Sequence, residues 1–590
     1  MKHMKRMMAL MLAFVLCLSM SGMAAFADET PAAPSYDYPL TVTDLAKGDT
    51  VKFYQVVEWV GETADKSDVS GWKALAQYSS VLTQDVLKSM LVGDPKADPA
   101  VAPTGMTSEI AGKLAKLAGN DGKDATSYSD DGKTATYNNA KSGMWMALVT
   151  PKDANTVYNP VFVSADYNKE TGHEGTVAVT GEFADGVAKS STVTLTKTAS
   201  TTEDGWDDNK PTTTAVGDTV NFTVTTTIPG YGEVYTDPHF VVTDELTALK
   251  LNKDSVVVTG LTQGEDKDYT VEATDSGYTI TFTKKYLQSL KAATSVTINY
   301  SAVVTVDAVN AVNEENNDVS IAYSHNPNNQ TDYDVKKDTT QHYTFSLDAA
   351  GIGKDVTETL KGKKTSEIVK IGKDAAGNPI TETRTTSQIG DPEKDYVEGP
   401  LNGAVFGLFT DNKGEVPYKD KAGNEVTATS GTDGRMNFTG LDAGTYYLKE
   451  ISAPDGFVKD STVHTVVIAA ETEKVNVTEW WNGSEWVSKK PTSGTAKEVT
   501  YETEILKSYS VTIDGKETAK YTFTNNKEPN STEIQWEEAE LIEHPFPFDN
   551  TEGTELPSTG GMGTTMFYVV GSVLVIGAAV LLISKRRMAR

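Results

Sequence analysis

The chain has 590 residues and a formal net charge of −29, with 82 acidic side chains against 53 lysines and arginines. This acidic balance argues against nucleic acid or an anionic lipid surface as the partner, and it fits a solvated surface protein. The only cysteine, Cys17, lies in the first apolar stretch, so disulfides cannot hold the rest of the chain together.

The N-terminus has the three parts of a secretory signal peptide. Three basic residues precede a short apolar run, and Ala25 and Ala27 supply the small side chains that a signal peptidase reads. We therefore expect cleavage between Ala27 and Asp28, which removes residues 1–27 and exports the rest. Residues 28–37 are polar and proline-containing, which indicates a flexible leader.

The exported part is predicted to be mainly β. Thr, Val, Ser and Gly are abundant, and stretches such as TVNFTVTTTI, YTITFT and SVTINYSAVVTV alternate apolar and polar residues with the period of half-buried strands. Residues 28–555 are long enough for three or four domains, which we expect to be tandem β-sandwiches.

Helical spacing and polar segments divide this region. Apolar residues three and four apart in WKALAQYSSVLTQDVLKSML and SEIAGKLAKLAG indicate helical insertions in the first domain. The polar string NPNNQTD marks a linker after the second domain. The predicted domains are 38–190, 191–329 and 343–527.

Residues 528–555 contain no lysine or arginine, many glutamates and three prolines. We expect an extended acidic stalk there. An apolar run at 566–583 follows, long enough to cross most of a bilayer as a helix, and the basic tail 584–590 would stay in the cytoplasm.

LPSTG, an apolar helix and a basic tail in this order resemble a cell-wall sorting signal of Gram-positive bacteria. The pentapeptide consists of Leu556, Pro557, Ser558, Thr559 and Gly560. The resemblance implies that a sortase, pilus-specific or housekeeping, cleaves between Thr559 and Gly560 and transfers the threonine carbonyl to an amine. The membrane helix would then serve the precursor only.

The third domain resembles the collagen-adhesin B-type, prealbumin-like modules of Gram-positive pilins. GAVFGLF matches a characteristic strand of that family, and YYLKEISAPDGF matches its E-box. In the family, a lysine on the first strand joins an asparagine on the last strand through an isopeptide bond, assisted by the E-box glutamate. The resemblance implies Lys370, Asn525 and Glu450 for these roles, with Lys373 as the fallback nucleophile.

Physical chemistry supports such a trio. A lysine amine attacks a carboxamide only when neutral, and burial lowers the pKa of a lysine while it raises that of a carboxyl. A protonated carboxyl can then polarise the amide and shuttle protons as ammonia leaves. Asn525 shares one strand face with Tyr521 and Phe523, which points it toward the core.

The second domain resembles the immunoglobulin-like D2 module of these pilins, in which an aspartate takes the glutamate's role. Lys197 in TVTLTKTAS shares the apolar face of its strand, and VVTDEL supplies Asp244. For the amide we favour Asn326, because YSHNP ends the predicted strand, and we keep Asn317 as the alternative.

A polymer subunit of this kind also needs a lysine that accepts the threonine of the next subunit. The usual YPK motif is absent. Lys189 stands at the matching place between the first two domains, with Lys152 and Lys169 as alternatives.

Trp480, Trp481 and Trp486 could form a carbohydrate or protein contact, although aromatic pairing across a hairpin that turns at Asn482 is the commoner explanation. The sequence has no phosphate loop, metal-ligand spacing or nucleophile-His-acid pattern, so we expect no cofactor, no metal and no enzyme beyond single-turnover bond formation.

The combined prediction is a major pilin: a structural, adhesive subunit of a covalent fimbria anchored to peptidoglycan. Its partners would be sortase, identical subunits and minor pilins, together with a host ligand that the sequence does not specify. The alternative is a monomeric wall-anchored adhesin that uses the same modules as a stalk.

Overall fold

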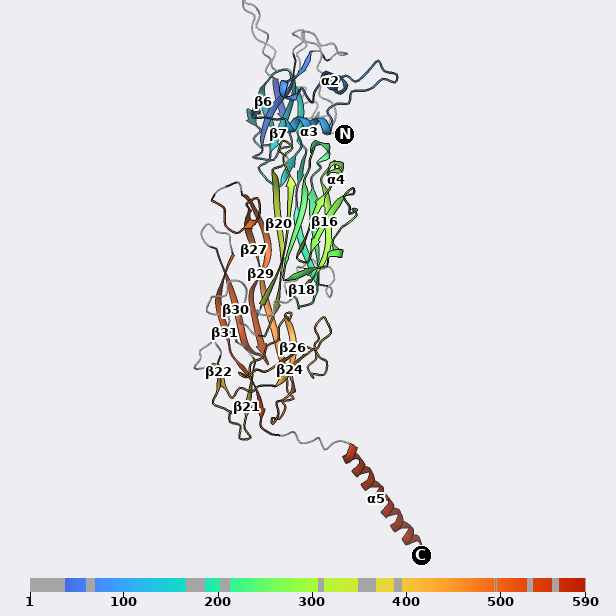
Figure 1. Ribbon diagram of the computed structural model, residues 1–590, viewed down its shortest axis with the longest axis vertical. Helices are drawn as coiled ribbons and strands as arrows, with labels where there is room; N and C mark the ends of the chain where they lie inside the picture. Colours follow the sequence, from blue (N-terminus) through green and yellow to red (C-terminus); the bar gives the residue numbers. More distant parts are fainter. Residues whose placement is uncertain are drawn as a thin grey trace, which may run out of the picture.

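The computed structural model shows three β modules stacked end to end, with one long helix projecting beyond the third (Figure 1). The predicted mainly β fold is confirmed. The signal-peptide site, Lys169 and the LPSTG motif lie outside the described residues. The structure describes residues 38–59, 69, 71–165, 186–201, 213–305, 312–329, 331–347, 368–386, 395–492, 494, 496–527, 534–553 and 562–588.

The first module consists of two antiparallel sheets, β1-β6-β5 and β3-β2-β7-β9, with β4 beside β2. Of the predicted helical stretch 72–91, only its last part is α-helix, and the second predicted helix forms as α3. The elements are β1 (Tyr38–Val42), β2 (Thr50–Trp59), β3 (Trp72–Ala74), η1 (Ala76–Tyr78), α2 (Gln84–Leu91), α3 (Ser108–Lys116), β4 (Lys123–Asp124), β5 (Ser127–Tyr128), β6 (Ala135–Ala140), β7 (Gly143–Thr150), β8 (Thr156–Tyr158) and β9 (Val161–Ala165).

The second module is a sandwich of the sheets β11-β12-β18-β14 and β16-β17-β13-β19-β20. Helix α3 of the first module packs on it so closely that a β-carbon at Gly112 would lie 1.9 Å from the carbonyl oxygen of Val234. The elements are β10 (Ser190–Thr192), β11 (Leu195–Thr201), β12 (Thr219–Ile228), η3 (Gly232–Val234), β13 (Phe240–Thr247), β14 (Leu249–Leu251), η4 (Lys253–Ser255), β15 (Val257–Val258), β16 (Tyr269–Thr274), β17 (Gly277–Phe282), α4 (Lys284–Ser289), β18 (Thr294–Val304), β19 (Val312–Ser324) and β20 (Tyr333–Phe345).

The third module is built on the sheet β25-β24-β26-β27-β29-β30-β31, with β28 beside β27, faced by the parallel pair β21-β32 and by β22-β23. The elements are β21 (Ile368–Lys373), β22 (Arg384–Thr386), β23 (Tyr396–Glu398), β24 (Val405–Phe409), β25 (Thr427–Thr429), β26 (Gly444–Ser452), β27 (Val463–Trp481), β28 (Trp486–Val487), β29 (Lys497–Ile513), β30 (Lys516–Lys527), β31 (Ile534–Glu543), β32 (Phe546–Thr551) and the projecting helix α5 (Met562–Met588).

Strand β20 joins the second module to the third. The sequence ended the second domain at 329, but after NPNNQTD the chain returns to pair with β19 along its full length. The far end of β20 then enters the core of the third module through Tyr343 and Phe345. Two modules that share one continuous strand cannot swivel freely about a flexible linker.

A long hairpin of β27 and β29 extends from the third module along β20 (Figure 1). Lys337 of β20 forms ion pairs with Glu479 of the hairpin at 2.7 Å and with Asp318 of β19 at 2.9 Å. Lys497 of the hairpin lies 2.8 Å from Asp332 and 2.9 Å from Asp334. The hairpin therefore braces the second module from outside.

The predicted acidic stalk at 528–555 is not only a stalk. It contains β31, which pairs with β30, and β32, which runs parallel to β21. Phe546 and Phe548 alternate with the exposed residues Pro547 and Asp549 and pack on the core, which outweighs the charge and proline content that suggested an open chain. After 553 the described chain resumes in α5, whose apolar stretch Met566–Arg587 is long enough to span a membrane.

Candidate crosslinking sites

The second module buries a lysine, an aspartate and an asparagine between its two sheets. Lys197 of β11 donates from Nζ to Asp244 Oδ2 of β13 at 2.7 Å and also to Oδ1 of Asn317 on β19. All three side chains are at most 1% exposed. The amine of Lys197 also lies 5.5 Å from the ring centre of Phe222 and 5.7 Å from that of Tyr300.

Burial decides the protonation of this pair. Loss of solvation lowers the pKa of Lys197, and the nearby carboxylate of Asp244 only partly opposes that shift. Loss of solvation likewise raises the pKa of Asp244 against the opposing effect of Lys197. The site thus favours a neutral amine beside a protonated acid, which is the state in which an amine can attack an amide.

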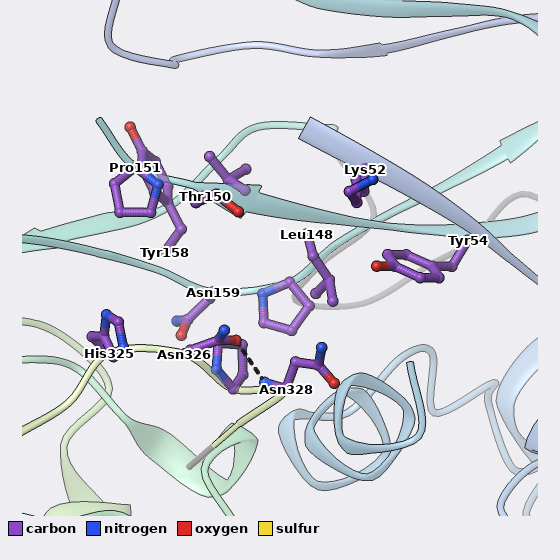
Figure 2. A pocket seen from close by; sticks show the side chains of 13 residues that line it. Lys52, Tyr54, Leu148, Thr150, Pro151, Tyr158, Asn159, His325, Asn326 and Asn328 are labelled. Atoms are coloured by element: carbon purple, nitrogen blue, oxygen red, sulfur yellow. Dashed lines mark hydrogen bonds between the residues drawn. The ribbon is translucent and has the colours of Figure 1, made fainter. Parts of the chain in front are cut away.

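Asn317, the alternative, occupies the position expected of Asn326. Asn317 lies well inside β19, which begins at Val312, and not at the start of that strand. Its side chain is buried between the two sheets of the sandwich. Asn326 follows the strand and accepts a hydrogen bond from the amide of Asn328 at 2.9 Å. Figure 2 shows it with His325 at a cavity of about 210 Å³ between the first two modules. Our preference for Asn326 is not supported by this geometry.

The third module has a comparable site. Lys370 of β21 donates from Nζ to Asn550 Oδ1 of β32 at 2.6 Å, and Asn550 Nδ2 donates to Glu450 Oε1 of β26 at 2.8 Å. The other carboxylate oxygen of Glu450 accepts from the amide of Asp460 at 2.7 Å. Lys370 Nζ lies 3.6 Å from Glu450 Oε1, and all three side chains are at most 1% exposed.

Desolvation again lowers the pKa of Lys370, against the opposing charge of Glu450. The ring of Phe406, centred 5.3 Å from the amine, supplies part of the apolar wall. Lys370 and Glu450 therefore lie on either side of one amide, in a surrounding that shifts the lysine toward its neutral form.

The main chain of the predicted partner Asn525 is not in the strand that pairs with Lys370. It lies in β30, where it pairs with Trp536 of β31, whereas β32 provides the amide next to Lys370. The sequence interpretation placed the last strand of the domain too early. The missed signal is the alternation of Phe546, Phe548 and Asn550, which gives Asn550 the phase that had favoured Asn525. The fallback nucleophile Lys373 instead forms an ion pair with Asp549 and is about one third exposed.

Two of the lysines proposed as acceptors, Lys189 and Lys152, lie near the junction of the first two modules. Lys189 is exposed next to the short strand β10, and its carbonyl oxygen accepts from the amide of Asn159 at 3.1 Å. Lys152 lies across Gly48, which leaves no room for a β-carbon at that glycine.

The tryptophan cluster is a hairpin structure. Trp481 and Trp486 are directly cross-strand, with ring centres 5.4 Å apart. Trp480 is 5% exposed and donates from Nε1 to Glu498 Oε2 at 3.0 Å. Aromatic pairing accounts for Trp481 and Trp486, and burial with a hydrogen bond to Glu498 accounts for Trp480.

Comparison with known proteins gives the class. Residues 392–481 match the SpaA family model, a prealbumin-like fold domain, and residues 549–589 match the LPXTG cell wall anchor motif. A prealbumin-like module upstream of such an anchor and an apolar helix defines a Gram-positive, wall-anchored surface protein that is membrane-bound as a precursor.

The chain is 27% identical over 501 residues to the trypsin-resistant surface T6 protein of Streptococcus pyogenes serotype M6. The aligned region covers 77% of this chain and 81% of the relative. Family matches and relative together support a sortase-assembled major pilin, a structural protein. Solved structures with similarity include the T6 backbone pilin of S. pyogenes (20% identity, TM-score 0.49, 89% of this chain, 100% of that chain) and the major pilin SpaD of Corynebacterium diphtheriae (16% identity, TM-score 0.38, 73% and 91%).

Proposed function

We propose that the chain is the shaft subunit of an adhesive pilus whose second and third modules are each closed by an isopeptide bond. The bonds join Lys197 to Asn317 and Lys370 to Asn550. The observation that carries the proposal is the placement of each buried amine within hydrogen-bonding distance of one amide oxygen, with an acid 2.7 Å away in the second module and 3.6 Å away in the third.

Each bond forms once, without a cofactor. The neutral amine attacks the amide carbon, a carbon–nitrogen bond forms, the original carbon–nitrogen bond breaks, and ammonia leaves. Asp244 or Glu450 carries the proton between the two nitrogens, and the fold holds the reactants at close range. The bonds would make the modules resistant to proteases, a property named in the T6 relative.

Polymerisation would use the sorting signal. Sortase would cleave after Thr559 and pass its carbonyl to a lysine near the junction of the first two modules, for which Lys189 is our candidate. A head-to-tail link of this kind does not close on itself and therefore grows as a filament. Minor pilins and peptidoglycan would use the same acyl donor.

Intact-mass measurement of the exported chain tests the bonds, because each bond removes one ammonia. We expect the measured mass to be lower than the mass calculated from the sequence by two ammonia molecules. A measured mass equal to the calculated one contradicts the bonds. A ladder of high-mass species on denaturing gels from cells with the cognate sortase tests the polymer. If the ladder is absent there, the monomeric adhesin is supported instead. Loss of the ladder in Lys189→Arg would identify the acceptor.

A further inference from the structure

The second crosslinking site contains a fourth polar side chain that has no counterpart among the described residues of the third site. Tyr300 of β18 donates from its hydroxyl to Asp244 Oδ2 at 2.7 Å and accepts from Asn317 Nδ2 at 2.9 Å. In the third module the amide nitrogen of Asn550 reaches its acid, Glu450, directly at 2.8 Å. In the part of the chain that the structure describes, a phenol therefore stands between acid and amide in the second module but not in the third.

We propose that Tyr300 is a catalytic residue of the Lys197–Asn317 bond, relaying a proton from Asp244 to the departing nitrogen of Asn317. This inference rests on the proposed function, since it concerns the reaction that closes the second module. The relay gives a reason why the second module uses an aspartate, Asp244, where the third uses a glutamate, Glu450. An aspartate is one methylene shorter than a glutamate, and the hydroxyl fills the gap.

The proton transfers balance. The neutral amine of Lys197 attacks Cγ of Asn317, and a Nζ–Cγ bond forms. Asp244 gives its proton to the Tyr300 oxygen while Tyr300 gives its own to Nδ2, the Cγ–Nδ2 bond breaks, and ammonia leaves. The surplus proton on Nζ returns to Asp244 Oδ2, 2.7 Å away. Acid and phenol are regenerated, and no oxidant or reductant is needed.

The surroundings keep the phenol in position and protonated. Its ring stacks on Phe222 with centres 5.1 Å apart and meets Tyr278 edge-on at 4.9 Å. Desolvation, together with the charge of Asp244, raises the pKa of Tyr300 well above its ordinary value. A phenylalanine would keep both ring contacts, so the hydroxyl can be tested apart from the packing.

The test follows the mature chain during cell-free synthesis, with intact mass and peptide mapping at timed quenches. In Tyr300→Phe we expect the Lys197–Asn317 peptide to form about 10-fold or more slowly, in the lower range of general acid–base effects. The Lys370–Asn550 peptide should form at the wild-type rate. The matched control is Tyr235→Phe, which removes another buried hydroxyl of the same module, one that has no hydrogen-bond partner among the described residues.

A second variant guards against misfolding. In Asp244→Glu/Tyr300→Phe, the longer acid should reach the amide as Glu450 does, and the rate should recover at least partly. Tyr300→Phe at a rate within twofold of wild type overturns the relay, and so does a Tyr235→Phe that is equally slow. If the wild-type chain itself never forms the Lys197–Asn317 peptide, the proposed function fails instead.

Discussion

The crosslinking site of the second module and that of the third contain the same kinds of side chain but take them from different places in their sheets. In the second module, Lys197 comes from one sheet, and Asp244 and Asn317 come from the sheet that faces it. In the third, Lys370 and Asn550 come from the two paired strands β21 and β32, where Asn550 lies two residues beyond the position opposite Lys370. The required chemistry is thus satisfied by two different strand arrangements.

The two sites also differ in what surrounds them. The main-chain amide of Lys197 donates to Asp338 Oδ2 of β20 at 2.6 Å, and the neighbouring Lys337 is held by the hairpin of the third module. The second site is therefore enclosed with help from the next module. The third site depends on a short terminal strand, so ordering of β32 must precede its bond.

The largest effect expected from this difference follows from loss of the proposed bond between Lys370 and Asn550 of the last strand, β32. In Asn550→Ala the bond cannot form, and residues 180 apart in sequence are no longer joined. A chain-entropy estimate gives about 5 kcal/mol less free energy of unfolding for the third module. Denaturant unfolding measures the decrease in the free energy of unfolding. The intact mass should show that the variant has lost one ammonia molecule where the wild type has lost two.

Asn525→Ala is the matched control, because it changes the asparagine that the sequence had favoured. It should leave both ammonia losses intact. If Asn525→Ala prevents the release of one ammonia molecule and Asn550→Ala does not, β32 does not supply the reacting amide.

The same comparison in the second module should give a similar effect over a shorter loop. Asn317 lies 120 residues from Lys197, and Asn317→Ala should lower the free energy of unfolding by about 5 kcal/mol, marginally less than in the third module. Asn326→Ala should keep the bond. Peptide mapping of the two variants decides, and a bond that persists in Asn317→Ala would restore Asn326.

Sequence reasoning singled out the lysines and acids that the structure buries together, but not the amides that lie beside them. Lys197, Asp244, Lys370 and Glu450 were identifiable because family motifs or strand phase mark them inside long alternating runs. The mainly β class and the projecting apolar helix were predictable for the same reason, since both depend on periodicity over many residues.

The amides depend on where a strand begins or ends, which periodicity fixes poorly. β19 begins five residues before Asn317. The segment after the second predicted domain, which was expected to be a linker, forms the core strand β20. In β32, the short alternation around Phe546 and Phe548 competes with an acidic, proline-rich context. Only tertiary pairing with β21 shows that this segment belongs to the core.

A smaller effect should follow from shortening the acid of the third site. Glu450→Asp removes one methylene at a site where no described tyrosine bridges acid and amide, so the acid should fall short of Asn550 Nδ2. We expect the Lys370–Asn550 peptide to form roughly 10-fold more slowly, as for loss of a positioned acid. Timed mapping measures it, with the Lys197–Asn317 peptide as the internal control. An unchanged rate would show that acid length does not distinguish the two sites.

The mildest test is the pH dependence of bond formation. Burial lowers the pKa of Lys197 and of Lys370, so the reactive neutral amine should accumulate at a pH below the ordinary lysine pKa of 10.5. The second site also needs protonated Asp244, whose pKa is raised by burial, so its rate should fall again once the pH exceeds that raised pKa. Chains quenched before reaction and refolded between about pH 5 and pH 9 would show this by mass. A second-module rate that still climbs toward pH 10.5 would mean that the amine keeps its solution pKa, and the buried neutral pair would then not be the reacting state.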